Sequence, residues 1–351
     1  MKASITKDTT IGTNNLRKKS SLNFGRLKGG IGLEGSLISL EIDREMATIK
    51  KSTIQCNPAL KRKEGETCLP PEAIERIVKA YNNDYPHKRI TIGTHTRKNH
   101  SSIKGGKHYN KIWKTFKNAM SECNNELCVL KHSKLDKSEK ENMIETYFRP
   151  EKPAEWTKDH DAWLDSLNIE DVMNQYEQAD STFEFIGPVP IDFAKETSFG
   201  HCIVDELCKL DLKTMEKGGT KKIGIVFNLD EHDEPGSHWI CGYIDIDRKS
   251  AYYFDSYGYK PPKRIADFMI GLTKQGIETL MYNDIRFQKK DSECGMYCLY
   301  VLICLLKGRS FADICKDVVD DDIMNAFRDI LFATDKPRKI AIDKALAKAC
   351  I

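Results

Sequence analysis

The feature that most constrains this sequence is a long apolar run that follows a Cys-Gly pair. Cys294-Gly295 opens the run, Met296–Leu306 continues it, and Lys307-Gly308 ends it with residues typical of a helix C-terminus. A helix that is apolar on every side has to be buried. The run is too short for a membrane span, which needs roughly 18–20 apolar residues. The sequence therefore predicts a large folded domain with a buried helix and without a membrane segment.

Strand patterns lie before this helix, and they fix the fold class. A helix between the third and fourth strands is opened by Pro261-Pro262 and ended by Gly276. The order is thus strand, strand, strand, helix, strand, helix, which is not a regular alternation of strands and helices. We predict an α+β fold, in which a central sheet is flanked by helices. The four predicted strands are Lys222–Leu229, Trp239–Ile246, Ala251–Phe254 and Thr279–Phe287.

Charge and composition divide the chain into three parts. Residues 1–50 read as a basic flexible tail, residues 51–155 as a mainly helical N-terminal domain, and residues 156–351 as the domain that contains the strands. Residues 1–150 hold 29 Lys and Arg against 16 Asp and Glu, whereas the remainder holds 26 against 36. The basic region is either a solvated surface or a region that contacts nucleic acid or an acidic partner.

The cysteines indicate a reducing compartment. The chain has 12 cysteines at irregular spacing and no CxxC pair, so we expect neither a zinc site nor a disulfide scaffold. We expect buried free thiols, with Cys294 as the exception. The N-terminus has no apolar segment of the kind that a secretory signal requires, which favours an intracellular protein.

Four polar residues fall where the predicted elements begin or end. His238 opens the second strand, Asp255 follows the third, Gln288 follows the fourth, and Cys294 begins the buried helix. In an antiparallel pair, the start of one strand lies beside the end of the next. We therefore expect His238 and Asp255 to face each other.

These residue types suit nucleophilic catalysis. A helix N-terminus and an imidazolium both favour the thiolate form of a cysteine such as Cys294. Asp255 would fix the tautomer of His238, and Gln288 would donate its amide N–H to an oxyanion beside the backbone N–H of Cys294. Each residue alone is typical of ordinary polar or buried positions, so the prediction rests on their joint order and spacing.

The same residues resemble a known family. Gly236-Ser237-His238-Trp239, Asp255 seventeen positions after the histidine, Gln288 six positions before the cysteine, and Asp291–Gly295 are similar to the cysteine proteases that process ubiquitin-like proteins. The maturation proteases of adenovirus and of the large DNA viruses belong to this group. Trp163-Leu164-Asp165 also resembles the entry motif of the family's catalytic core. The resemblance covers about residues 160–310.

The resemblance implies a fold, an activity and a substrate class. The fold would be a papain-like-superfamily core over residues 156–351, with a central mixed sheet, and the activity that of a cysteine endopeptidase without metal or cofactor. Members cleave after Gly-Gly-type sites, and Trp239 would wall a groove too narrow for side chains. Within the group, the likeness is greatest to the polyprotein-processing proteases of African swine fever virus and giant viruses, which implies a location in the virion or in a viral factory in the host cytoplasm.

Other functions stay open. The same residues would serve a deconjugating protease for a SUMO-type modifier, or, more remotely, an acetyltransferase. The basic region motivates a different class, a nucleic-acid- or capsid-binding protein that uses the protease fold as a scaffold. Leu27-Lys28-Gly29-Gly30-Ile31 also raises the hypothesis of self-cleavage at Gly30–Ile31, although Gly-Gly pairs are common in flexible loops.

Overall fold

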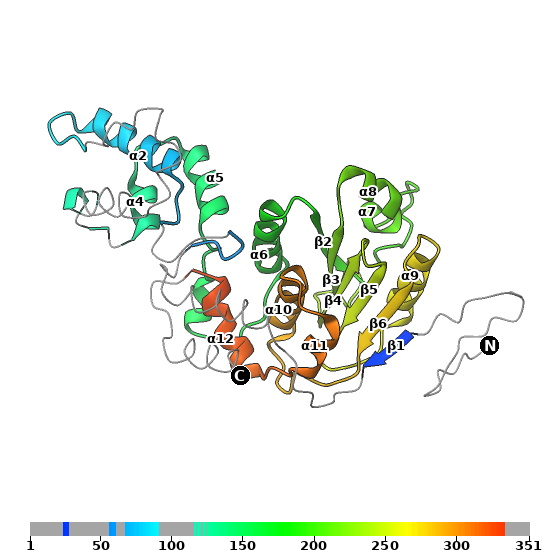
Figure 1. The fold of residues 1–351 in the computed structure, drawn as a ribbon. Helices are drawn as coiled ribbons and strands as arrows, with labels where there is room; N and C mark the ends of the chain where they lie inside the picture. Colours follow the sequence, from blue (N-terminus) through cyan, green and yellow to red (C-terminus); the bar gives the residue numbers. More distant parts are fainter. Residues whose placement is uncertain are drawn as a thin grey trace, which may run out of the picture. The chain divides into compact units, whose positions relative to one another are not determined.

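The computed structural model describes residues 24–27, 56–60, 67–90, 116, 118–120, 122–123 and 125–333. The chain divides into two compact units (Figure 1). Unit 1 comprises Met1–Gly35, Trp163–Glu170 and Asp180–Asp321. Unit 2 comprises Ser36–Ala162, Asp171–Ala179 and Asp322–Ile351. Among the described residues, no helix combines the length and the apolar character that a membrane crossing requires.

Unit 1 is built on a six-stranded mixed sheet. The strand order is β1-β6-β5-β4-β3-β2, and only β3–β4 and β4–β5 are antiparallel. The predicted α+β fold with a central mixed sheet is thus confirmed, and each of the four predicted strands is present. The strands are β1 (Phe24–Leu27), β2 (Phe183–Pro190), β3 (Lys222–Asn228), β4 (Trp239–Asp245), β5 (Ser250–Phe254) and β6 (Thr279–Asn283).

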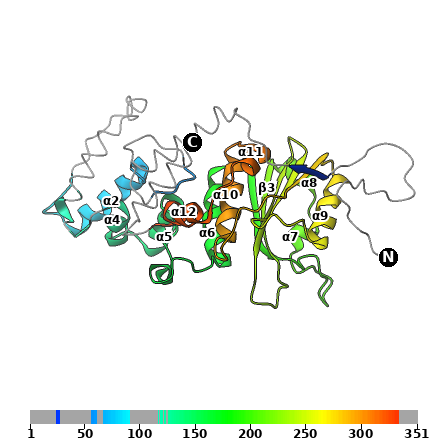
Figure 2. The same cartoon turned by 90° about the horizontal axis from the view of Figure 1, so that it is seen from below.

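Helices cover both faces of this sheet (Figure 2). One face carries α7 (Asp205–Cys208), α8 (Leu212–Gly218) and α9 (Lys263–Thr273), whose apolar side chains share a core with β2–β6. The other face carries α10 (Cys294–Leu306) and α11 (Phe311–Lys316). Because both faces are covered, the middle of β3 is buried without interruption, a pattern typical of central strands.

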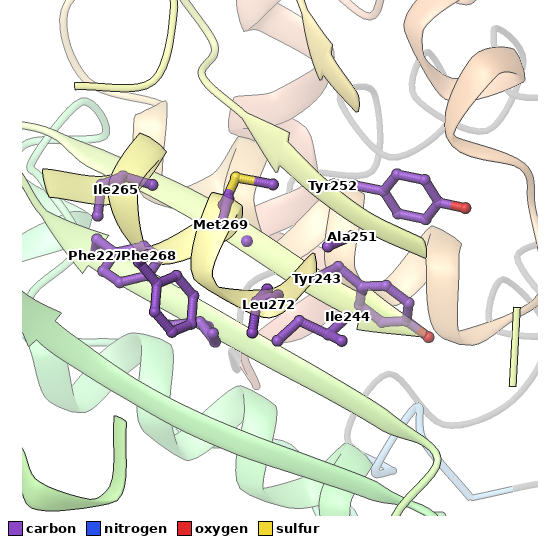
Figure 3. Close-up of a pocket in the computed structure, with 11 residues that line it drawn as sticks. Phe227, Tyr243, Ile244, Ala251, Tyr252, Ile265, Phe268, Met269 and Leu272 are labelled. Carbon is purple, nitrogen blue, oxygen red and sulfur yellow. The ribbon is translucent and has the colours of Figure 1, made fainter. Parts of the chain in front are cut away.

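A small cavity lies where α9 packs on the sheet (Figure 3). Ile265, Met269 and Leu272 of α9 line it together with apolar and aromatic side chains of β3, β4 and β5, including Ile244 and Ala251. None of the predicted site residues lines this cavity. Its lining belongs to the hydrophobic core and offers no group for catalysis.

Two strands of unit 1 were not predicted, and both lack a regular pattern. In β2, the register shifts between Ile186 and Val189 around the cis peptide bond Gly187–Pro188, so apolar residues do not alternate. Strand β1 has four residues and pairs in parallel with β6. Such a pairing is formed by backbone hydrogen bonds, which leave no pattern of side chains in the sequence. The strand also lies within residues 1–50, which were expected to form a flexible tail.

The described part of unit 2 is mainly helical. Residues 91–115 lie outside the described residues. The C-terminal helix α12 falls almost wholly in unit 2, although the sequence grouped residues 322–351 with the strand-bearing domain. The helical elements are α2 (Pro71–Asp84), α4 (Glu126–His132), α5 (Lys137–Tyr147), η2 (Ala154–Thr157), the larger part of α6 (Ser166–Ala179) and α12 (Asp321–Leu331).

The cysteines correct one expectation. Six of them form disulfides, so the expectation of free thiols was wrong for Cys56–Cys68, Cys123–Cys128 and Cys202–Cys208. The tertiary structure brings the Cα atoms of each pair to 5.1–6.5 Å, a separation that spacing along the chain does not reveal. The free cysteines in the described part of the chain are Cys241, Cys294, Cys298, Cys304 and Cys315, and all five are buried.

Candidate active site

Helix α10 carries the predicted nucleophile at its first residue. Cys294 begins the helix, where the backbone N–H groups of the first turn have no partner within the helix and favour a negative charge. The rest of α10 is buried almost throughout, as its apolar sequence predicted. Packing of this helix against β3 and β4 fixes where the thiol lies.

Antiparallel pairing brings the base to its carboxylate. Cys241 of β4 pairs with Phe254 of β5, so the residue before β4 lies near the residue after β5. The Nε2 atom of His238 lies 2.8 Å from Oδ1 of Asp255. Cys294 is close enough to His238 to help raise its pKa, and Nδ1 is the ring nitrogen that the contact with Asp255 leaves available. The structure therefore brings all three predicted residues together.

The histidine is held in its charged form. Burial acts against the imidazolium, but hydrogen bonds with the Asp255 carboxylate and the Cys294 sulfur outweigh it and raise the pKa of His238 to about 9. At neutral pH, His238 is therefore protonated beside the thiol. An imidazolium in this position stabilises a thiolate, which is the reactive form of cysteine.

Three other thiols of unit 1 are in surroundings that favour the protonated form. Burial raises the pKa of Cys298 and Cys304, and raises the pKa of Cys315 to about 12. A buried thiol of this kind stays protonated and unreactive. Contact with the imidazolium of His238 thus distinguishes Cys294 from these three.

A serine fixes the amide of Gln288. Ser256 Oγ donates a hydrogen bond to Gln288 Oε1 over 2.7 Å, so the Nε2 group of the amide is left to donate elsewhere. The backbone N–H groups of Phe287 and Gln288 both donate to the carbonyl of Ser256. The Gln288 side chain is fully buried, so these contacts hold it in one orientation. This arrangement suits the predicted role of Gln288 at an oxyanion.

Trp239 lies against the backbone that follows the nucleophile. Its Nε1 donates to the carbonyl of Leu164 over 2.9 Å. A Cβ atom on Gly295 would lie 3.3 Å from Trp239 Cδ1 and 3.1 Å from the Leu164 side chain. Trp239 itself is mostly buried, as a core tryptophan would be. The role of Trp239 as the wall of a substrate groove stays a prediction. The part of the side chain that would form this wall is the ring edge beside Gly295.

Sequence reasoning missed several residues that hold the site. Asn283 accepts from the Asp255 N–H and donates to the Asp255 carbonyl, both over 2.8 Å. Asp321 accepts from the backbone N–H groups of Lys289 and Lys290, in the loop between Gln288 and Cys294. Asn283 and Asp321 are distant in sequence from the backbone that they fix, and no local pattern identifies them.

The sequence does contain a turn signal directly after β5. Asp255-Ser256-Tyr257-Gly258 has aspartate and glycine at the first and fourth positions that a type I turn favours. The Gly258 N–H donates to the Asp255 carbonyl over 2.8 Å, and Gly258 has a φ of +73°. The sequence therefore contained a turn that positions Asp255.

Two groups of potential metal ligands occur among the described residues. They are Cys123, Cys128 and His132, and Cys202, Asp205 and Cys208. In each group, the two sulfur atoms are joined in a disulfide. A disulfide provides no thiolate to a metal ion, so neither group forms a metal site in this state.

The geometry is that of a thiol peptidase, and sequence comparison agrees. Residues 220–337 match the sequence profile of the Ulp1 protease family, C-terminal catalytic domain. The protein carries a Ulp1-family cysteine peptidase domain. This match includes His238, Asp255, Gln288 and Cys294, so the family recognised from the sequence is confirmed.

Two relatives of this chain are named as viral proteases. A protein of Acanthamoeba polyphaga mimivirus, named as a thiol protease, is 28% identical over 303 residues, which cover 81% of this chain and 96% of the relative. A cysteine protease of African swine fever virus is 26% identical over 233 residues, which cover 60% of this chain and 83% of the relative. None of these similarities supports nucleic-acid binding by the basic region.

A solved structure has the same fold. The crystal structure of the African swine fever virus pS273R protease aligns with a TM-score of 0.51 at 20% identity, covering 80% of this chain and 95% of that chain. At this identity, the similarity concerns the fold alone. The Ulp1-family domain thus has the architecture of a viral cysteine protease.

Proposed function

We propose that this protein is an endopeptidase that cleaves viral polyproteins or capsid proteins after Gly-Gly-type sites. The observation that carries this proposal is the His238–Asp255 pair beside Cys294 at the start of α10, in a chain similar to viral thiol and cysteine proteases. Trp239 and Leu164 pack closely on Gly295, so Trp239 lies next to the residue that follows the nucleophile. The preference for glycine follows from the family resemblance, with Trp239 as the expected wall of the substrate groove.

The mechanism follows from the four polar residues. The Cys294 thiolate attacks the carbonyl carbon of the glycine before the scissile bond, and the oxyanion accepts hydrogen bonds from Gln288 and from backbone N–H groups. His238 gives its proton to the leaving amine as the thioester forms. Neutral His238 then takes a proton from water, which hydrolyses the thioester and restores the enzyme. Asp255 holds His238 in position throughout.

The main alternative is a deconjugating protease. Several African swine fever virus relatives are named SUMO-1 cysteine protease, and one is 32% identical over 117 residues, 31% of this chain. A folded modifier with a Gly-Gly tail would present the same chemistry to Cys294. The difference lies in the substrate surface outside the site.

Two substrate panels separate these functions. One contains unstructured peptides with Gly-Gly-X sites, and the other contains folded ubiquitin-like modifiers with C-terminal reporters. We expect wild-type protein to cleave the peptides after the second glycine, and Cys294→Ala protein to cleave nothing. Cleavage of folded modifiers without cleavage of peptides would replace the proposal by deconjugation. No cleavage of either panel would favour a scaffold function.

The expectations about location and self-processing remain proposals. We propose that the protein acts in the virion or in the cytoplasmic viral factory, which follows from its proposed substrates. The Gly30–Ile31 bond lies outside the described residues. Intact masses of wild-type and Cys294→Ala protein test self-cleavage there, and identical N-termini would exclude it.

A further inference from the structure

Tyr257 contacts the catalytic residues on two sides, and nothing in the family comparison assigns it a role. It follows Asp255 and Ser256 in the turn after β5, and its backbone N–H donates to Asp255 Oδ1 over 2.9 Å. The same oxygen contacts His238. The backbone of Tyr257 therefore already helps to fix the carboxylate that orients the base.

The ring of Tyr257 lies on the imidazole of His238. The ring centroids are 4.8 Å apart, and the ring planes are inclined by 29°. A protonated imidazole is a cation, and the face of an aromatic ring attracts cations. The other charged groups at this pair are Asp255 and Cys294, which contact His238, and Arg286 and Asp291, which contact Tyr257. The ring thus favours a charged His238 and limits its rotation.

The hydroxyl of Tyr257 lies at the predicted oxyanion residue. Gln288 Nε2 donates to it over 3.5 Å, while Ser256 holds the Oε1 atom of the same amide. The hydroxyl proton is directed to the loop before the nucleophile, with Lys290 O and Asp291 Oδ1 each 3.4 Å away. The long Gln288 contact is weak, so an oxyanion can replace it without a large penalty.

We propose that Tyr257 is a positioning residue for the peptidase reaction. Its ring supports the His238 imidazolium that pairs with the Cys294 thiolate. Its hydroxyl gives the Nε2 group of Gln288, whose Oε1 atom Ser256 already fixes, a partner that an oxyanion can replace. The two halves of this proposal concern different groups, since the ring acts on the base and the hydroxyl acts on the oxyanion donor.

Two substitutions separate the two halves. Tyr257→Phe keeps the ring and removes the hydroxyl, whereas Tyr257→Leu removes both. Tyr85→Leu is the matched control, because Tyr85 is a tyrosine of unit 2 that is 46% exposed and whose ring packs on Tyr81. The first readout is the rate at which iodoacetamide alkylates Cys294 between pH 5 and pH 10, measured by mass spectrometry of the Cys294 peptide. This readout needs no substrate, so it stands even if the proposed Gly-Gly specificity is wrong.

For the ring, we expect Tyr257→Leu to slow alkylation near pH 6 about tenfold, because less thiolate is present when the imidazolium is weakened. Tyr257→Phe and Tyr85→Leu should retain the wild-type pH profile. A wild-type profile for Tyr257→Leu would overturn this half of the proposal. If Tyr257→Leu does not fold, as judged by thermal denaturation, Tyr257→Met provides the same test with a flexible side chain.

For the hydroxyl, the second readout is steady-state cleavage of a peptide substrate. We expect Tyr257→Phe to lower kcat about tenfold with KM unchanged, because the lost contact aligns a group that acts in the transition state. Tyr85→Phe should keep wild-type kcat and KM. Turnover of Tyr257→Phe at the wild-type rate, or an effect on KM alone, would refute the hydroxyl half.

Discussion

At the scale of single residues, the site depends on keeping two opposite charges in a buried place. Asp255 is 1% exposed, and the His238 side chain is 10% exposed. An isolated charge there would be unfavourable, but each charge has a partner of opposite sign within hydrogen-bond distance. The arrangement therefore supplies a protonated base and a reactive thiol before substrate binds.

Substitution of the nucleophile and of the carboxylate should have unequal effects. Cys294→Ala should abolish peptide cleavage, because it removes the nucleophile that lies beside His238. Asp255→Asn keeps the shape but loses the charge that stabilises the imidazolium, so we expect kcat to fall about 10³–10⁴-fold. Measurement of kcat/KM with one peptide checks both, and near-normal turnover by Cys294→Ala would disprove the assignment.

The pKa of His238 sets an upper limit on the active pH range. Its folded-state pKa is raised from 6.5 to about 9. Protonated His238 therefore contributes stability that is fully present below about pH 6.5 and is lost as pH rises through about 9. We expect kcat/KM to fall as pH rises through the same range, because the leaving amine then lacks its proton donor. Asp255→Asn should move this fall in kcat/KM to lower pH. If the fall stays at the same pH, the Asp255 carboxylate does not raise the pKa of His238.

At the scale of elements, the turn after β5 organises the site. Three consecutive residues of this turn each have a different contact: Asp255 with His238, Ser256 with Gln288, and Tyr257 with both. The turn closes on Gly258, which lies against the backbone of Ile285. This short turn therefore holds the backbone at Ile285 and the side chain of Gln288, both of which precede Cys294 in the sequence.

A methyl group on Gly258 should damage the site. Its Cβ would lie 2.8 Å from the carbonyl carbon of Ile285, and the residue has positive φ. We expect Gly258→Ala to lower the free energy of unfolding by about 1–3 kcal/mol and to lower kcat. Gly271→Ala is the control, since a Cβ there meets nothing and alanine favours helix α9. Chemical denaturation measures both, and equal stability of the two variants would contradict this account.

At the scale of the whole molecule, each unit is assembled from separate stretches of chain. In unit 2, a buried ion pair joins two of these stretches, with Lys152 Nζ 2.8 Å from Asp329 Oδ1 in α12. The backbone of Lys152 also donates to the Ala333 carbonyl over 2.9 Å. These contacts attach the C-terminal helix to a segment nearly 180 residues earlier in the sequence.

Removal of one charge of this pair should destabilise unit 2. Lys152→Met removes the ammonium group that pairs with the fully buried Asp329 carboxylate. We expect the free energy of unfolding to fall by about 3 kcal/mol. Lys137→Met, which removes an exposed ion pair with Glu141, should leave the melting temperature unchanged. Adding Asp329→Asn to Lys152→Met should recover part of the stability. If the double variant is destabilised by the sum of the two single effects, Lys152 and Asp329 do not stabilise each other.

The sequence alone determined the central elements and the chemistry of this protein. Buried strands and the apolar helix after Cys294 have regular local patterns, and the functional residues lie at their ends, so pairing rules place His238 near Asp255. Only the tertiary structure decided the rest. Strand β2 has an irregular register, the disulfides depend on distances through space, and Asn283, Ser256 and Tyr257 act through contacts with residues that fold back on them. Local patterns record burial and turn preference, but a contact between distant residues exists only once the chain is packed.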